Sequence, residues 1–223
     1  PYQGGAAADL NFIPVAAIDH IEVLQDGAAA QYGSDAIAGV INIILKSNHH
    51  GGTASATGGG YWDGGGKTVG GSANVGFEPF KDAFLNLTAE SKYHDYSDRG
   101  GIDPRLLDAG NLAAAPGMTS IPGYPYLNKI QGDAQYHLQV LAANFGWDIG
   151  KDAQVYAIAT YGEKVARAYE NYRLPTRIPK MYPQGFSPKE KMNQKDFAFT
   201  GGVKGKLGDW NLDLSITYGR DKS

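Results

Sequence analysis

Polar and apolar residues alternate along several stretches of the chain, and a period of two residues predicts β-strands whose two faces differ in polarity. In residues 83–94 the odd positions include Leu85 and Leu87, whereas the even positions include Asn86 and Thr88. Seven strands are predicted in this way, at residues 53–62, 69–77, 83–94, 136–149, 154–165, 197–207 and 212–218. The alternation is weaker in the first, fourth and fifth of them, so their registers are left open.

The connections between these strands differ in length in a regular way. Short turns follow the second, fourth and sixth strands, whereas about forty residues (95–135) follow the third and about thirty (166–194) follow the fifth. The connection after the first strand is short and breaks the pattern. In an antiparallel meander, alternate connections lie at opposite ends, so one rim carries tight turns and the other large loops, as in outer-membrane barrels.

The length of the strands separates a membrane barrel from a soluble sheet. Segments of 10 to 13 residues exceed the five or six usual in soluble sheets and suit a tilted crossing of a bilayer. We therefore predict an all-β membrane barrel with apolar side chains facing lipid and polar side chains facing inward. The reverse orientation would turn Lys92 toward hydrocarbon, at a cost of about 2 to 4 kcal/mol at the midplane. A soluble β-sandwich, whose strands also alternate, is the competing interpretation.

The first fifty residues have a different sequence pattern, which predicts a small α+β unit. Residues 18–24 are rich in β-branched residues and end at Asp26-Gly27, and residues 39–45 form an apolar run interrupted only by Asn42. Between them, residues 28–32 are long enough for one helical turn. Such a unit is too small to bury a sizeable core alone, so we expect it to pack against the larger sheet.

Composition and charge narrow the function classes. The 223 residues include 20 Lys and Arg against 23 Asp and Glu, and this balance speaks against a nucleic-acid partner. Cysteine is absent, which excludes disulfides and thiolate chemistry. No hydrolase or zinc-protease motif occurs, so we expect neither an enzyme nor a cofactor. The longest apolar run, Val40–Leu45, is far shorter than the roughly 20 residues of a membrane-spanning helix.

Two short sequences look like ligand sites and are interpreted otherwise. Residues 63–68 end like a phosphate-binding loop, but Tyr61 stands where the first glycine is required. His49 and His50 point to opposite faces of an extended backbone, and no carboxylate or thiol at zinc-like spacing accompanies them. We expect a solvated hinge there rather than a metal site.

Residues 18–46 resemble the end of the plug domain of TonB-dependent outer-membrane receptors, a family with the pattern I-E-x-I-E-V followed by Y-G-x-x-A-x-(G/A)-G-V-I-N-I. The matching residues are Ile18, Ile21, Glu22, Val23, Tyr32, Gly33, Ala36, Gly39, Val40, Ile41, Asn42 and Ile43. The resemblance implies that these residues hold the structure of the plug. His20 and Gln25 stand where the family often has charged residues, which puts ion pairing of the plug with the barrel in doubt.

The resemblance also implies a 22-stranded barrel filled by a plug. Residues 1–50 would be the C-terminal part of the plug and residues 51–223 the first strands of the transmembrane barrel, so the chain is expected to be part of a longer protein. The family imports scarce ligands across the outer membrane of Gram-negative bacteria. A ferric siderophore is the favoured ligand, and haem, cobalamin and oligosaccharides stay open because their receptors share the plug pattern. The resemblance also implies TonB as a partner acting through an earlier plug segment, and outer-membrane lipid and lipopolysaccharide around the barrel.

Ligand contacts are expected in the two long loops, where tyrosines and arginines gather. Aromatic rings and guanidinium groups together suit anionic, aryl-bearing or sugar-like ligands. The candidates are Tyr96, Arg99, Tyr124, Tyr126, Arg167, Tyr169, Tyr172, Arg173 and Arg177. Alternatively, they are ordinary loop residues whose arginines pair with lipopolysaccharide phosphate. For the whole protein, the alternatives are an adhesion or docking barrel without transport and an exported soluble β-domain.

Overall fold

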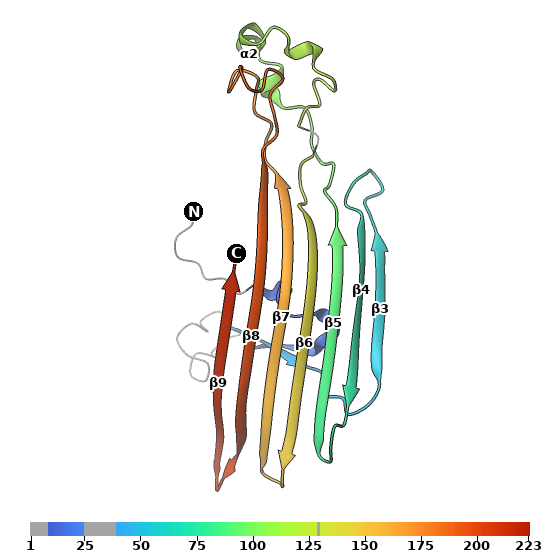
Figure 1. Cartoon of the computed structure of the whole chain (residues 1–223), viewed down its shortest axis with the longest axis vertical. Helices are drawn as coiled ribbons and strands as arrows, with labels where there is room; N and C mark the ends of the chain where they lie inside the picture. Colours follow the sequence, from blue (N-terminus) through green and yellow to red (C-terminus); the bar gives the residue numbers. More distant parts are fainter. Residues whose placement is uncertain (1–8, 25–38, 129) are drawn as a thin grey trace.

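One antiparallel sheet makes up most of the computed structural model, which describes residues 9–24, 39–128 and 130–223 (Figure 1). Its strands follow the order of the sequence, so each strand pairs with the next. They are β3 (Gly52–Gly59), β4 (Thr68–Phe77), β5 (Ala83–His94), β6 (Gln135–Ile149), β7 (Ala153–Tyr169), β8 (Lys189–Leu207) and β9 (Trp210–Lys222). The predicted all-β antiparallel meander of seven strands is confirmed.

Tight turns and large loops lie at opposite ends of this sheet, as the alternating connection lengths predict (Figure 1). The connection from β5 to β6 contains short helices in a region predicted only as loop: η3 (Pro104–Leu106), α2 (Ala109–Ala114) and η4 (Met118–Ser120). Asp103 and Asp108 cap the first two, because each side chain accepts a backbone N–H of the first turn. None of the helices among the described residues is long and apolar enough to cross a membrane.

Several strand boundaries differ from the prediction, and β9 is also longer at both ends than the predicted residues 212–218. β8 begins at Lys189, well before residue 197, and β7 extends to Tyr169. The added part of β8 has charged or polar residues on both faces, so the alternation that predicts a strand is missing although pairing with β7 continues. β3 ends early at Gly59, because the Tyr61 N–H donates to the Gly65 carbonyl at 3.2 Å and closes a turn.

A second, two-stranded sheet comes first in the chain. β1 (Ile18–Leu24) and β2 (Val40–Leu45) pair antiparallel after the short turns η1 (Leu10–Phe12) and η2 (Val15–Ala17), so both predicted strands are confirmed. The Asn42 amide donates to the Glu22 carboxylate directly opposite, at 2.9 Å. The predicted helical turn at 28–32, together with Tyr32 and Gly33, lies outside the described residues.

The two faces of the large sheet have opposite character. We call the face that carries Asn86 and Thr88 the inner face; these side chains are 2% and 4% exposed. The outer face carries Leu87 and Leu141, which are 42% and 57% exposed. Within the described part of the chain no second sheet covers the outer face, so the observed arrangement is not a β-sandwich. The apolar rows thus face away from the molecule, as predicted for a barrel wall.

Candidate functional site

Two asparagines on the inner face hold the segment that follows the two-stranded sheet. Asn86 on β5 and Asn144 on β6 are direct cross-strand partners. The Asn86 amide donates to the Asn48 carbonyl at 2.9 Å, and the Asn144 amide donates to the Lys46 carbonyl at 3.0 Å. One rung of the sheet therefore binds two carbonyls, two residues apart, of one extended segment. We call this pair the asparagine clamp.

A glycine beside the clamp permits this close approach. A Cβ at Gly76 on β4 would overlap the backbone carbonyl of Asn48. The buried Asn74 and Thr88 complete the polar patch, with the Asn74 amide donating to the Thr88 hydroxyl at 2.8 Å. The carbonyl oxygens of the Asn74 and Asn86 side chains have no hydrogen-bond partner among the described residues. This part of the wall therefore keeps unused acceptors facing the interior.

Residues 9–17 make a second set of contacts with the inner face. The Val15 N–H donates to the Glu90 carboxylate at 3.2 Å. The Phe12 ring packs on Leu138 and Val140 of β6 and also covers Gly162, where a Cβ would overlap it. The segment is thus held by both polar and apolar contacts.

The two ends of the small unit are tied to each other as well. The Lys46 N–H donates to the Ala17 carbonyl at 2.9 Å, joining the segment before β1 to the one after β2. His20 contacts acids of its own strand, Asp19 at 2.7 Å and Glu22 at 3.7 Å. The hydrogen bond to Asp19 raises the pKa of this exposed histidine.

The two long loops fold together into one unit at the opposite end from the tight turns. Leu106 and Met118 of the first loop and Tyr172 of the second are buried against one another. The Arg105 guanidinium of the first loop donates to the Tyr172 carbonyl at 3.0 Å. We call this unit the loop core. The sequence predicts two separate loops, and the shared core is absent from that prediction.

Several predicted ligand residues make structural contacts in the loop core. Tyr172 is buried, its hydroxyl donates to the Gln184 carbonyl, and burial raises its pKa. The Tyr124 hydroxyl donates to the Leu106 carbonyl at 2.8 Å. Arg173 pairs with Glu170. Of the predicted ligand residues in this unit, Tyr126 and Arg177 are exposed.

The other predicted ligand residues lie where the loops leave the strands. Tyr96 and Tyr169 pack with ring centroids 5.0 Å apart, and the Lys189 ammonium lies 4.4 Å from the Tyr169 ring. Arg99 forms an ion pair with Asp63 at 3.1 Å. Arg167 pairs with Gln135 and shares the outer face with Leu141 by register. The nine candidates are therefore not brought together in one site, and their contact with a ligand stays a prediction.

A network that the sequence did not suggest anchors the β3–β4 turn to the first loop. The Tyr61 phenol donates to the Asp133 carboxylate at 2.5 Å, and His94 lies 3.3 Å from the same carboxylate. The phenol hydrogen bond lowers the pKa of Asp133 and raises that of Tyr61. Arg99 lies over the Tyr61 ring at 4.5 Å.

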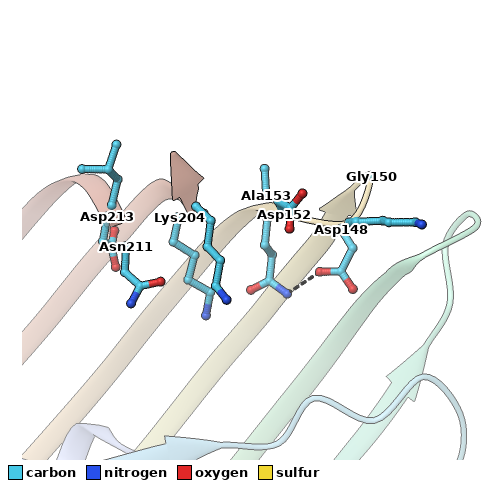
Figure 2. A pocket seen from close by; sticks show the side chains of 12 residues that line it. Asp148, Gly150, Asp152, Ala153, Lys204, Asn211 and Asp213 are labelled. Carbon is cyan, nitrogen blue, oxygen red and sulfur yellow. Dashed lines mark hydrogen bonds between the residues drawn. The ribbon is translucent and has the colours of Figure 1, made fainter. Parts of the chain in front are cut away.

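Two of the hollows in the described part of the chain lie where a ligand could enter, at the large loops and on the inner face. One of about 580 Å³ lies between the two loops and is lined mainly by apolar residues, including Met118, Ile121 and Pro179, and by none of the nine candidates. The other, of about 590 Å³, lies on the inner face near the tight turns (Figure 2). There the Gln154 amide donates to Asp148 at 2.7 Å. Both volumes are within the usual range of small-molecule pockets.

Comparisons with known proteins agree with this geometry. The TonB-dependent Receptor Plug Domain family model matches residues 1–40. The vitamin B12 transporter BtuB of Photobacterium profundum is 41% identical over 75 residues, 32% of this chain and 12% of that protein. The probable TonB-dependent siderophore receptor PirA of Acinetobacter baumannii is 58% identical over 38 residues, 17% of this chain and 5% of that protein.

A solved structure has the same fold over nearly the whole chain. A mutant of the ferric enterobactin receptor PfeA of Pseudomonas aeruginosa, in complex with enterobactin, superimposes with a TM-score of 0.65 at 15% identity. The match covers 96% of this chain and 29% of that one. The present chain thus spans about an eighth of the BtuB relative and less than a third of the solved receptor. The resemblance to TonB-dependent receptors predicted from residues 18–46 is confirmed.

Proposed function

We propose that the chain is part of a TonB-dependent outer-membrane transporter that takes up a scarce ligand, with a ferric siderophore as the favoured ligand. In this proposal residues 1–50 are the C-terminal part of the plug and residues 51–223 the first part of the transmembrane barrel. The protein lies in the outer membrane of a Gram-negative bacterium, with the large loops outside the cell. It works by binding and movement and catalyses no reaction.

The observation that carries the proposal is the two-faced sheet. Its apolar outer face is uncovered, while its polar inner face holds the segments on both sides of β1 and β2. A wall that binds a plug on one side and meets hydrocarbon on the other suits a gated pore. Soluble sheets bury the apolar face instead.

The contacts between plug and wall suit a plug that is held firmly and can still be moved. The asparagine clamp and the Val15–Glu90 contact are hydrogen bonds to neutral backbone groups, each worth about 0.5 to 3 kcal/mol net. Force applied by TonB to an earlier plug segment would break such bonds one after another. Water or the unused acceptors of Asn74 and Asn86 would then receive the freed donors.

The choice of ligand in this proposal rests on the loop core and on the named relatives. The hollow between the loops offers an apolar surface for the aryl groups of a ferric siderophore. Tyr126 and Arg177 do not line it, but they are exposed in the same loop core and offer an aromatic and a cationic group to an anionic ligand. A cobalamin is the second candidate, because the BtuB match of 75 residues is longer than the PirA match of 38.

Uptake measurements on the intact gene test the proposal. A deletion strain is supplied with radiolabelled ferric siderophores or cobalamin, with and without functional TonB. We expect deletion of the gene, or loss of TonB, to abolish uptake of one ligand class. A plasmid-borne copy of the gene should restore uptake in the deletion strain. Uptake that is unchanged for every ligand would refute transport. Loss of cobalamin uptake alone would show that the ligand is a cobalamin and not a siderophore.

The alternatives make different predictions for fractionation. A docking barrel without transport would give a heat-modifiable band in outer membranes but normal uptake in the deletion strain. An exported soluble β-domain would be recovered in buffer without detergent. The uncovered outer face favours the first of these over the second.

A further inference from the structure

A hollow of about 470 Å³ lies between the small unit and the first three strands of the large sheet. Val15, Ala16 and Lys46 line it on the side of the small unit. On the other side the inner face of β3, β4 and β5 contributes four hydroxyl side chains, those of Thr53, Ser55, Thr57 and Ser72. We call this hollow the hydroxyl groove.

Small residues form the floor of the hydroxyl groove. Ser55 and Ser72 lie directly opposite each other, and their hydroxyl oxygens are 2.7 Å apart. In the next row toward the large loops, Thr57 lies opposite Gly70. The strand residues that line the groove, all of them described, include no aromatic and no large apolar side chain. The strands therefore present a polar surface that leaves the space above it open.

The contact of the small unit with β6 is different in kind. There Phe12 packs on Leu138 and Val140, and it lies so close to Gly162 of β7 that a Cβ at this glycine would overlap its ring. The contact is thus apolar and tight. A polar solute finds room beside β3, β4 and β5 and none beside Phe12.

Two ammonium groups and one carboxylate line the hydroxyl groove. Neither Lys46 nor Lys92 forms an ion pair with any residue that the structure describes, and the Lys46 ammonium donates to the Thr53 hydroxyl at 3.3 Å. The carboxylate is that of Glu90, which accepts the Val15 N–H at 3.2 Å. The groove therefore has a net positive charge, and its two cations are free to meet an anion.

The groove has one end toward the large loops and one toward the segment that follows β2. Thr57 and Lys92 belong to its row nearest the loops. At the other end Lys46 crosses the wall, because Asn144 of β6 holds its carbonyl and Thr53 of β3 holds its ammonium. A solute that enters from the loops would therefore meet Lys92 first and Lys46 last.

We propose that the hydroxyl groove is the passage by which the transported ligand leaves the outer mouth, and that Lys92 and Lys46 make this passage select anions. The hydroxyl groups donate hydrogen bonds to an anion that has shed part of its water. Exposed ion pairs contribute little binding energy, so the anion is attracted without being trapped. This inference rests on the proposed function, because it assumes transport from the large loops toward the tight turns.

Thiol labelling of the intact protein in nanodiscs, in a background without other cysteines, tests the selection of anions. Ser72→Cys places a thiol in the groove, and Ser215→Cys places one at an exposed position of the inner face outside it. Two methanethiosulfonates of similar size are compared, one with a sulfonate and one with a trimethylammonium group. The anion-to-cation rate ratio at Ser72→Cys should exceed that at Ser215→Cys about 10-fold, at the lower end of electrostatic steering.

Charge variants show whether the two lysines cause this preference. Lys46→Gln together with Lys92→Gln should abolish it, whereas Lys46→Arg together with Lys92→Arg should keep it. The matched control is Lys81→Gln together with Lys151→Gln, which loses the same charge in the tight turns and should also keep it.

Uptake by cells with the labelled protein tests the passage itself. A bulky reagent attached to Ser72→Cys should stop energised uptake and leave binding of the ligand at the cell surface unchanged. The same reagent attached to Ser215→Cys should leave uptake unchanged. Because the label is added after folding, a loss of uptake cannot come from misfolding.

Three results would overturn the proposal. They are an unreactive thiol in Ser72→Cys, equal anion-to-cation ratios at the two thiols, and normal uptake after labelling of Ser72→Cys. The failure of transport itself has a different signature. If the unlabelled protein takes up no ligand while the thiol in the groove still prefers the anionic reagent, transport is refuted and the selection of anions stands.

Discussion

Replacing Asn86 by Asp tests whether the asparagine clamp holds the segment that follows β2. Asn86 is 2% exposed and its amide donates to the Asn48 carbonyl at 2.9 Å. The variant Asn86→Asp keeps the shape of the side chain, yet its carboxylate cannot donate, so the buried carbonyl loses its partner. Loss of one partner in a buried pair costs about 1 to 3 kcal/mol. This corresponds to a rise of about 5-fold to 150-fold in local opening of residues 46–52.

Hydrogen exchange on the intact protein in detergent measures that opening. The reporters are the Lys46 N–H, which donates to Ala17 at 2.9 Å, and the Gly76 N–H, which donates to Gly51 at 2.8 Å. Asn193→Asp is the matched control, because Asn193 is exposed on β8. Exchange at the reporters should accelerate in Asn86→Asp and stay unchanged in the control. If both variants exchange like wild type, the asparagine clamp does not stabilise the segment that follows β2 and the reasoning fails.

Three further predictions concern packing and charge. Gly76→Ala should displace the segment at residue 48 and accelerate its exchange, whereas Gly71→Ala on the same strand, where a Cβ meets only ordinary contacts, should not. Leu106→Ala should destabilise the loop core by about 2 to 5 kcal/mol and expose it to limited proteolysis, unlike Leu107→Ala at a 55% exposed position. The lowered pKa of Asp133 means that its anchoring of the β3–β4 turn is complete above the ordinary pKa of 3.8 and is lost as pH falls through the folded-state value. Proteolysis of that turn should rise over this range, and Asp133→Asn should abolish the pH dependence.

The alternation of side chains predicted the sheet because the two faces meet different surroundings. Between Ala83 and His94 the polar positions lie on the inner face, which holds the segments before β1 and after β2, and the apolar positions face outward. The periodicity is therefore strong and the predicted strand ends are correct. Where polar residues occupy both faces the signal disappears. The start of β8 at Lys189 was missed for that reason, since a strand can be extended by backbone pairing alone.

The asparagine clamp was harder to predict from the sequence because it depends on the register between two strands. Asn86 and Asn144 are ordinary inward-facing residues until the pairing of β5 with β6 places them on one rung. The register of the strand at 136–149 was left open, so the asparagine clamp could not be inferred. The choice of tyrosines and arginines by residue type did not identify their partners. Tyr172 and Tyr124, for example, serve the loop core.

The shared interior of the two large loops has a consequence for engineering this protein. Exchanging either loop alone with that of a relative would leave half of an apolar interior without its complement, because Tyr172 of one loop is buried against Leu106 and Met118 of the other. The large loops can therefore be exchanged between relatives only by moving both segments as a matched set. Diversification in nature would face the same constraint, so changes in one segment should be accompanied by compensating changes in the other.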